Sequence, residues 1–150
     1  YGETPDILDH GYVLVDFENN ARAMLELCMF AEGSRFQEDI SAVGATGKIE
    51  CYVPGPKRFW PEHLGEAPTP HVIESPRNPS GPRVIDTPID PSLLQAGDHN
   101  GSTFYQHREF LALVRGERQG AAVSVTDGIE AVRLGMAAQQ SAATGQAVSL

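Results

Sequence analysis

The sequence predicts an α+β fold in which strands come first and helices follow. Between residues 12 and 53, apolar side chains recur at every second position, which is the period of a strand. After Gly101 the spacing changes to that of a helix, and runs of strands followed by runs of helices are typical of α+β domains. At 150 residues the chain has the length of one domain, which we expect to span residues 1–150.

Four strands are expected in the first third of the chain, at residues 12–17, 21–30, 36–43 and 48–53. The turn Glu18-Asn19-Asn20 joins the first two as a hairpin, because Asn tolerates the positive φ of a tight turn. Gly44-Ala45-Thr46-Gly47 is the turn between the third and the fourth. In the second strand one face is apolar and the other is mixed, which indicates a surface for a partner or a ligand.

Residues 53–91 contain ten of the eleven prolines and are expected to form a long excursion. Proline removes a backbone donor, so the only strands predicted there are short edge strands, at 71–74 and 83–86. The excursion is expected to pack as a lid or a dimer arm, because it holds residues of buried type, Phe59, Trp60, Val72 and Ile73.

The first predicted helix spans residues 103–115. Thr103 and Gln106 have the spacing of a capping box at its start. Gly116 ends the helical run.

The second predicted helix begins with Asp127 and Glu130 in the capping relation and ends at Gly145. Both helices are expected to pack on the sheet, because each carries an apolar stripe. Residues 148–150 are expected to form a last short strand.

Composition and charge exclude several classes of protein. No apolar run approaches the roughly 20 residues that span a bilayer, and the N-terminus does not resemble a signal peptide. The net charge of -9 would repel nucleic acid and anionic lipid. Cys28 and Cys51 lack metal-ligand spacing, so two buried free thiols and a cytoplasmic location are expected. The chain does not begin with Met, which suggests a piece of a longer protein.

Common catalytic and nucleotide-binding motifs do not occur in the sequence. No two glycines lie two positions apart, so GxGxxG is excluded, and no GxxxxGK[ST] loop is present. The GxSxG, HExxH and EF-hand patterns are also missing. No catalytic, cofactor-binding or metal-binding residue is therefore predicted in this chain.

A cluster of polar residues surrounds the start of the first predicted helix. Residues 98–103 read Asp-His-Asn-Gly-Ser-Thr, and Tyr105 and His107 follow. Free N–H groups at a helix start, with hydroxyl, amide and imidazole groups, suit a polyhydroxylated ligand. The predicted substrate-binding residues are His99, Ser102, Tyr105 and His107. The alternative is structural: Thr103 caps the helix, Tyr105 is interfacial and His107 is a core histidine.

The other histidines are interpreted as structural or exposed. Asp6 and His10 have Asp-x-x-x-His spacing, which would place both on one face of a helix. Pro5 and the strand that follows leave little room for a helix, so a solvated turn is favoured. His63 and His71 have no Asp, Glu or Cys at ligand spacing and are expected at the surface.

Four segments carry a resemblance to a known family. They are residues 12–23 (YVLVDFENNARA), 40–50 (ISAVGATGKIE), 101–110 (GSTFYQHREF) and 127–142 (DGIEAVRLGMAAQQSA). Together, in this order, they resemble the C-terminal domain of the glucose-fructose oxidoreductase, inositol dehydrogenase and rhizopine-catabolism (Gfo/Idh/MocA) family. The resemblance covers nearly the whole chain outside the excursion.

The resemblance implies a large, mostly antiparallel, open-faced sheet with helices packed on one face. The other face would serve the substrate and pairing with a second subunit, as a dimer or tetramer. It also implies NAD or NADP chemistry on a sugar, inositol or related polyol, assisted by a Lys of a Glu-Lys-Pro motif and an Asp-x-x-x-His pair. Lys48 and Lys57 do not belong to such a motif, and Asp6 and His10 abut the first strand directly. Asn20 replaces the glycine usual in the hairpin.

The parent protein is therefore expected to be an NAD(P)-dependent oxidoreductase whose N-terminal Rossmann domain is absent from this chain. The chain would be its substrate-binding and oligomerisation domain, inactive alone and pairing as a homo-oligomer through the sheet. One alternative is a stand-alone, non-catalytic module for ligand binding or dimerisation. A cone-shaped α+β enzyme would need helices before the strands, and none is visible in the sequence.

Overall fold

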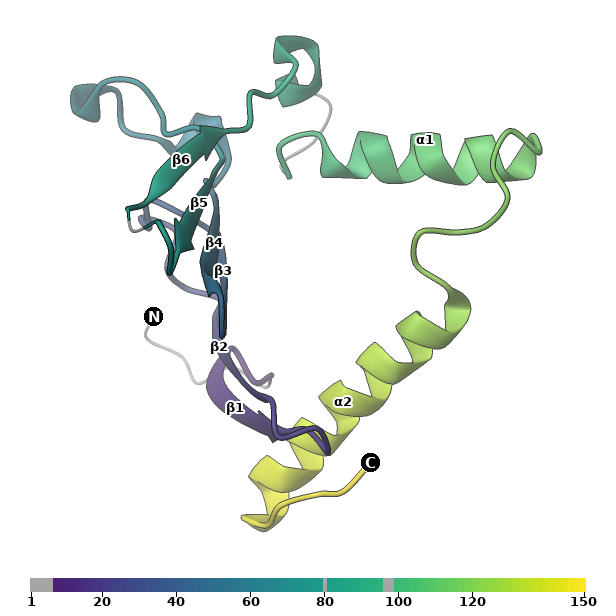
Figure 1. The fold of residues 1–150 in the computed structure, drawn as a ribbon. Helices are drawn as coiled ribbons and strands as arrows, with labels where there is room; N and C mark the ends of the chain where they lie inside the picture. The colour runs from purple at the N-terminus through teal and green to yellow at the C-terminus, as the bar shows by residue number, and fades with distance from the viewer. Residues whose placement is uncertain (1–6, 80, 96–98) are drawn as a thin grey trace. The chain divides into compact units, whose positions relative to one another are not determined.

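A computed structural model describes residues 7–79, 81–95 and 99–150, with the backbone alone at residues 94 and 95. It confirms the α+β class (Figure 1). The strands are β1 (His10–Asp16), β2 (Arg22–Cys28), β3 (Glu38–Gly44), β4 (Gly47–Val53), β5 (His71–Pro76) and β6 (Arg83–Asp86). The α-helices are α1 (Ser102–Val114) and α2 (Val125–Thr144), and short 3₁₀ turns lie at Lys57–Phe59, Glu62–Leu64 and Pro91–Gln95. Asp6 and Asp98 lie outside the described residues.

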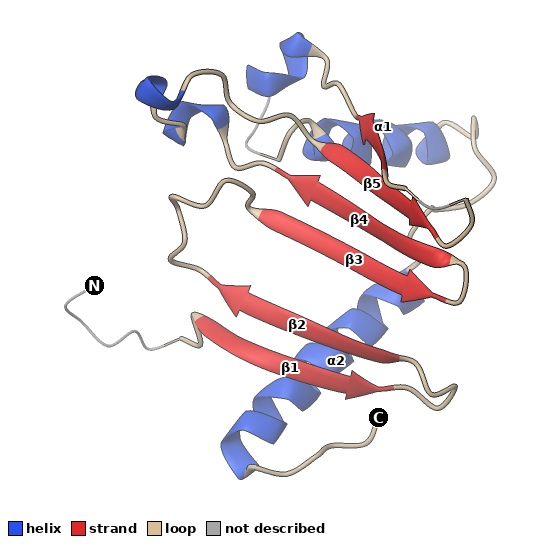
Figure 2. Cartoon of the chain, turned by 60° about the vertical axis from the view of Figure 1, so that its left-hand side comes forward, coloured by secondary structure: helices blue, strands red, loops and turns tan. Residues whose placement is uncertain are grey.

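The strands form two antiparallel sheets, where the resemblance implied one large sheet. One sheet is the β1–β2 hairpin, and the other has the order β3-β4-β5-β6, with β3, β4 and β5 visible side by side in Figure 2. The chain divides into two compact units, one of residues 1–28 and 109–150 and one of residues 29–108. Each sheet belongs to one unit.

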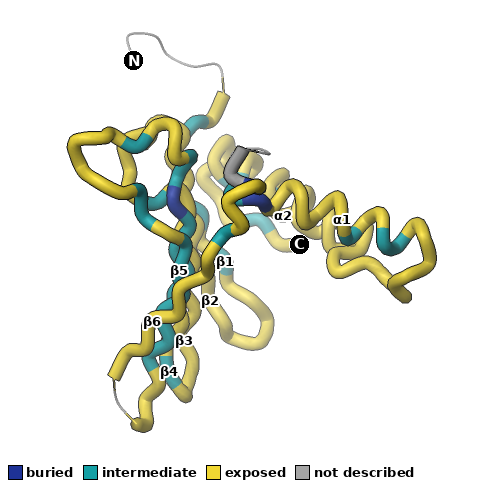
Figure 3. Tube along the Cα trace, turned by 90° about the horizontal axis from the view of Figure 1, so that it is seen from above, coloured by how far each residue is buried: buried dark blue, intermediate teal, exposed yellow. Residues whose placement is uncertain are grey.

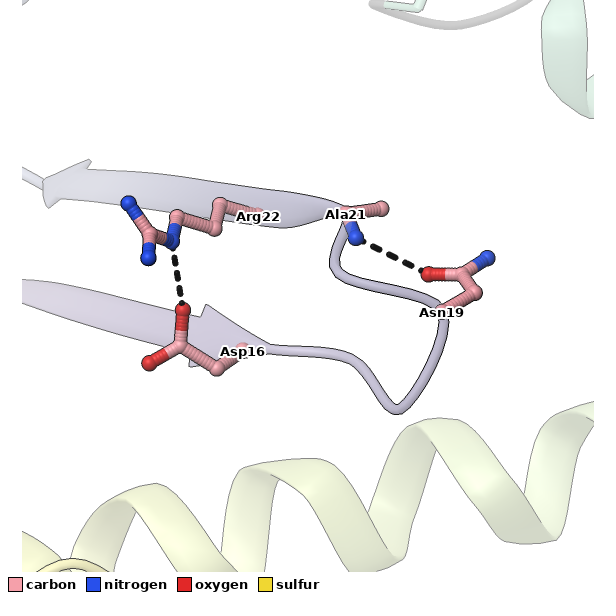
Figure 4. Close-up of polar contacts among 4 residues, drawn as sticks. All are labelled: Asp16, Asn19, Ala21 and Arg22. Carbon is pink, nitrogen blue, oxygen red and sulfur yellow. Dashed lines mark hydrogen bonds and ion pairs between the residues drawn. The ribbon is translucent and has the colours of Figure 1, made fainter.

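The β1–β2 hairpin of the first unit has the predicted turn and the predicted faces. Asn20 has a φ of 65°, and the Asn19 side chain accepts a hydrogen bond of 2.9 Å from the Ala21 N–H (Figure 4). Arg22 and Asp16, which are paired across the strands, form an ion pair of 3.0 Å. Along β1 burial alternates, so that Gly11, Val13 and Val15 are half-buried. The residues opposite these three in β2 are Leu27, Leu25 and Ala23, as the apolar face of the sequence predicts.

The sheet of the second unit also has two different faces. Residues directly opposite each other in an antiparallel register lie on the same face. One face, called the apolar face below, carries Ile40, Ala42, Ile49, Cys51, Val53, Val72 and Ile85, together with the ion pair of Glu74 and Arg83. The other, mixed face carries Asp39, Ser41, Val43, Lys48, Glu50, Tyr52, His71, Ile73, Ser75, Val84 and Asp86. Glu38 lies opposite Val53 and so stands at the end of the apolar face.

The close pairing of β4 with β5 depends on Gly47. A Cβ atom on this residue would lie 2.5 Å from the Ser75 carbonyl oxygen, which is closer than side chains approach a backbone. The predicted Gly44–Gly47 turn is thus both a hairpin turn and a point of close backbone contact. The predicted short strands at 71–74 and 83–86 correspond to β5 and β6. β6 is an edge strand as predicted, but β5 pairs with both β4 and β6, so the prediction of an edge strand at 71–74 is wrong.

The second helix begins earlier than its sequence pattern predicts. Ser124 is the N-cap: its side chain accepts a hydrogen bond of 3.1 Å from the Asp127 N–H. The Asp127 carboxylate accepts one of 2.8 Å from the Ser124 N–H in return, which completes a capping box. Asp127 is therefore the third residue of the helix and not its cap. The predicted C-terminus is confirmed, because Gly145 ends α2 with a φ of 67°.

Two further local predictions differ from the structure. α1 begins at Ser102, so Thr103 lies inside the helix. Residues 148–150 are not a strand. A lone terminal segment forms a strand only if it finds a ladder partner, and the apolar pattern alone does not supply one.

Most of the described residues are exposed, as Figure 3 shows. The buried ones are Pro54, Leu93 and Gly101, all in the second unit, and Leu93 is 8% exposed. The cysteines are free as predicted, but Cys28 is exposed and Cys51 half-buried, so the expectation that both are buried is wrong. No helix in the described part of the chain is long and apolar enough to cross a bilayer.

Candidate functional site

A pocket of about 410 Å³ lies in the second unit, at the start of α1. Its lining comes from the first residues of β3, the end of β4, the segments before β5 and after β6, and the start of α1. The lining residues are Gln37, Glu38, Val53, Pro70, Thr87, Pro88, Ile89, His99, Asn100, Ser102 and Tyr105. The volume falls within the range of about 300–1,000 Å³ that is typical of small-molecule pockets.

Three of the four predicted substrate-binding residues line this pocket. His99, Ser102 and Tyr105 belong to its lining, and His107 does not. All four side chains are exposed, so the alternative of a core histidine at position 107 does not hold. The sequence pattern could not exclude His107, because it lies close along the same helix and carries the same kind of polar group.

The start of α1 is held by two residues with positive φ. Asn100 has a φ of 53° and Gly101 one of 86°. The turn that they form lets the Ser102 N–H donate to the His99 carbonyl at 2.9 Å, while the Tyr105 N–H donates to the Gly101 carbonyl at 3.1 Å. This geometry places His99, Ser102 and Tyr105 around the first turn of the helix.

Packing against Leu93 also fixes this turn at the start of α1. A Cβ atom on Gly101 would lie 3.2 Å from both Cβ and Cδ1 of Leu93, so the Leu93 side chain packs directly on the backbone of Gly101. Both residues are buried, in a chain whose described residues are otherwise largely exposed. The best-packed part of the described structure therefore supports the pocket.

A long-range hydrogen bond joins the helix start to the sheet. The Asn100 side-chain N–H donates to the Pro54 carbonyl at 2.9 Å, and Pro54 is buried. Next to this bond, the N–H of Gln37, the residue before β3, donates to the Val53 carbonyl at the end of β4 at 2.8 Å. This bond continues the β3–β4 pairing as far as the pocket. These bonds hold the walls of the pocket together.

Gln37, Glu38 and Asn100 are lining residues that the sequence did not indicate. Asn100 lies within the predicted polar cluster, so its position was a usable signal. Glu38 begins β3 and Gln37 precedes it, far from that cluster in the sequence. The pairing of this segment with the end of β4 brings both residues to the pocket. Strand pairing is a long-range property that local patterns do not show.

The mixed face of the sheet carries a row of coupled polar groups. Glu50 accepts hydrogen bonds from Lys48 at 2.8 Å and from the Tyr52 hydroxyl at 3.0 Å. The bond from Lys48, followed by that from Tyr52, lowers the pKa of the Glu50 carboxyl, and the same bonds raise the pKa of Lys48 and of Tyr52. None of the three lines the pocket. We therefore interpret this row of hydrogen bonds as stabilising strand β4 and not as part of the pocket.

Aromatic rings extend this row at the end of the sheet. Tyr52 and His71 are paired across β4 and β5 and their rings stack with centroids 5.1 Å apart. The Phe36 ring lies 5.0 Å from Tyr52 and 5.4 Å from His71. His71 is thus half-buried in a ring cluster, and the expectation of a surface histidine is wrong. Among the described residues, no group of three His, Cys, Asp or Glu side chains is placed to hold a metal ion.

Comparison with protein families identifies the chain. The family model described as the oxidoreductase family, C-terminal alpha/beta domain, matches residues 2–150. The chain belongs to the Gfo/Idh/MocA oxidoreductase family. Its C-terminal domain thus accounts for nearly every residue, including the proline-rich excursion that the resemblance had left out. Comparison with curated proteins gives no match.

The residues of this Gfo/Idh/MocA domain do not fit a dinucleotide. A pyrophosphate is usually held by a glycine-rich loop at a helix start, or by Lys and Arg side chains. The chain has no GxGxxG, and the described part of the pocket lining holds Glu38 as its one carboxylate residue and no Lys or Arg. A bound pyrophosphate would face that carboxylate.

Proposed function

We propose that the pocket at the start of α1 binds the polyol substrate of an NAD(P)-dependent oxidoreductase. The family match gives the C-terminal domain of an oxidoreductase. One observation supports the proposal that this domain binds a polyol. Polar side chains gather around one pocket: His99, Asn100, Ser102, Tyr105 and Glu38.

The chemistry of the lining suits a sugar, an inositol or a related polyol. Hydroxyl groups of such a ligand both donate and accept hydrogen bonds. Ser102 and Tyr105 hydroxyls can do the same, while the Glu38 carboxylate accepts and the His99 ring offers one donor and one acceptor when neutral. The apolar side chains of Val53 and Ile89 supply the flatter surface that sugar C–H groups require.

The cofactor belongs to another part of the parent protein in this proposal. NAD or NADP would supply hydride chemistry, and this chain would bind and orient the polyol. The lack of a fit between these residues and a pyrophosphate supports that division. The chain alone should therefore bind polyols without oxidising them.

Ligand binding by the isolated chain tests the proposal. Saturation-transfer and chemical-shift titrations with myo-inositol and D-glucose should detect binding to the wild-type chain. Replacing His99 by Ala or Tyr105 by Phe removes one hydrogen bond each, worth about 1 kcal/mol, so affinity should fall roughly fivefold. His107→Ala is the matched control and should leave affinity unchanged, because His107 does not line the pocket.

Two results would contradict the proposal. One is equal affinity of the wild type and the His99 and Tyr105 variants. The other is polyol-dependent reduction of NAD or NADP by the isolated chain above the buffer blank, because hydride transfer would then be housed in these residues.

We also propose that the mixed face of the second unit pairs with a second copy of the chain. The apolar face of the same sheet ends at the pocket, through Glu38 and Val53. On the mixed face Val43 is 78% exposed, opposite Lys48, and Val84 is 60% exposed. Exposed apolar and aromatic side chains interspersed with charge are typical of non-obligate interfaces.

A further inference from the structure

The described lining of the pocket holds a carboxylate residue and no Lys or Arg to balance it. Glu38 is the carboxylate among these lining residues. A second carboxylate, Asp90, follows the lining residue Ile89 directly. Hydrogen bonds from the Ser92 hydroxyl and N–H lower the pKa of Asp90, so it stays charged.

The Glu38 carboxylate is available to a ligand. It is exposed, and no hydrogen bond or ion pair within the described part of the chain occupies it. Its backbone is fixed at the start of β3, opposite Val53. An ionised carboxylate accepts hydrogen bonds and cannot donate them, so it attracts hydroxyl and ammonium groups and repels a second anion.

Two positive features oppose this negative charge: Arg108, which lies outside the described lining, and the start of α1, which lines the pocket through Ser102. The guanidinium of Arg108 lies over the Tyr105 ring, with its carbon 4.7 Å from the ring centroid, and it does not line the pocket. The start of α1 contributes roughly half a positive charge. A carboxylate contributes a full negative charge where the helix start contributes about half a positive one, and Arg108 lies outside the described lining, so Glu38 makes the charge of the lining negative.

We propose that Glu38 sets the charge preference of this pocket, which takes amino-substituted and neutral polyols and rejects polyols that bear a carboxylate or a phosphate. This inference rests on the proposed polyol-binding function of the same site. It narrows the substrate class to cationic and neutral polyols.

Four matched probes test the preference. D-glucosamine, D-glucose, D-glucuronate and glucose 6-phosphate share one ring and differ in charge. Chemical-shift titration of the full chain at low ionic strength should give the tightest binding for glucosamine, then glucose. Glucuronate and glucose 6-phosphate should bind at least tenfold more weakly than glucosamine, and added salt should reduce the difference.

Variants assign the preference to one side chain. Glu38→Gln should remove most of the difference between glucosamine and glucuronate while glucose binding changes little, and Glu38→Lys should reverse the order. Asp39→Asn is the matched control, because Asp39 is adjacent, removes the same charge and lies opposite Tyr52, on the other face of the sheet. It should keep the wild-type order. Dispersed backbone amide spectra establish that each variant is folded.

The outcomes separate this inference from the function on which it rests. If glucuronate binds the wild type as tightly as glucosamine, or if Asp39→Asn changes the order as much as Glu38→Gln, the inference is wrong and polyol binding stands. If none of the four probes binds the wild type, polyol binding itself is wrong, and the inference is lost with it.

Discussion

At the scale of single residues, the site depends on the backbone of Asn100 and Gly101. Both have positive φ, a region that costs most side chains free energy and costs Gly none. Asn is among the residues that adopt it most readily, and here its side chain also bonds to Pro54. The sequence shows an Asn-Gly pair before a helix. The structure shows that this pair joins the start of α1 to Pro54 and Leu93.

Gly101→Ala should destabilise the chain and weaken polyol binding. The alanine would have to adopt a φ of 86°, and its Cβ atom would lie 3.2 Å from Cβ and Cδ1 of Leu93. We expect the free energy of unfolding to fall by about 1–3 kcal/mol, measured by urea denaturation. The control is Gly116→Ala, where φ is 72° and no atom lies within 4 Å of the added Cβ. Its loss should be smaller and binding should persist. Equal losses and unchanged binding in both variants would show that the Leu93 contact is unimportant.

At the scale of elements, helix ends and strand turns follow from local chemistry. The Asn20 turn and the Gly145 cap lie where the residue types predict them. The start of α2 was misplaced because Asp127 is a good cap in isolation, and Ser124, three residues earlier, competes for the same role. Ser124 with Asp127 is itself a capping-box pattern, so the correct start was visible in the sequence.

Stability should depend on pH through this capping box. Hydrogen bonds from the Ser124 hydroxyl and N–H lower the pKa of Asp127 in the folded chain below its unfolded value. Its stabilising contribution is therefore complete well above the unfolded pKa of 3.8 and is lost as the pH falls below that value and through the lower folded pKa. The difference in unfolding free energy between wild type and Asp127→Asn should shrink over that range. A difference that stays constant with pH would rule out this linkage.

Ser124→Ala tests the other half of the same capping box. It removes the acceptor for the Asp127 N–H and should lower the free energy of unfolding by about 1 kcal/mol at neutral pH.

At the scale of the whole molecule, the described residues leave much apolar surface exposed. Large apolar side chains are exposed on every strand of both sheets except β5, and along both helices. Contiguous exposed apolar surface in a folded chain marks a place where another chain or domain binds. The exposed apolar surface supports the proposal that the chain pairs with a second copy of itself.

Sedimentation velocity should show self-association that depends on the mixed face. The wild-type chain should sediment as a dimer or larger species at micromolar concentration, and Val43→Lys should shift it toward the monomer, because a charge would be buried at the interface. Val123→Lys is the control, since Val123 is 71% exposed and lies outside the sheet. A wild-type monomer, or equal shifts in both variants, would contradict pairing through this face.

The sequence by itself determined the approximate positions of the six strands and two helices, the two turns and the family, because periodicity, turn residues and caps act over a few neighbouring positions. It was wrong about a strand at residues 148–150 and about the start of α2. It also gave His99, Ser102 and Tyr105, which lie close together along the chain. Only the tertiary structure brought Glu38 and Gln37 to these residues and separated His107 from them. Strand register and the packing of Leu93 on Gly101 decide that arrangement, and both join residues that are distant or unremarkable in the sequence.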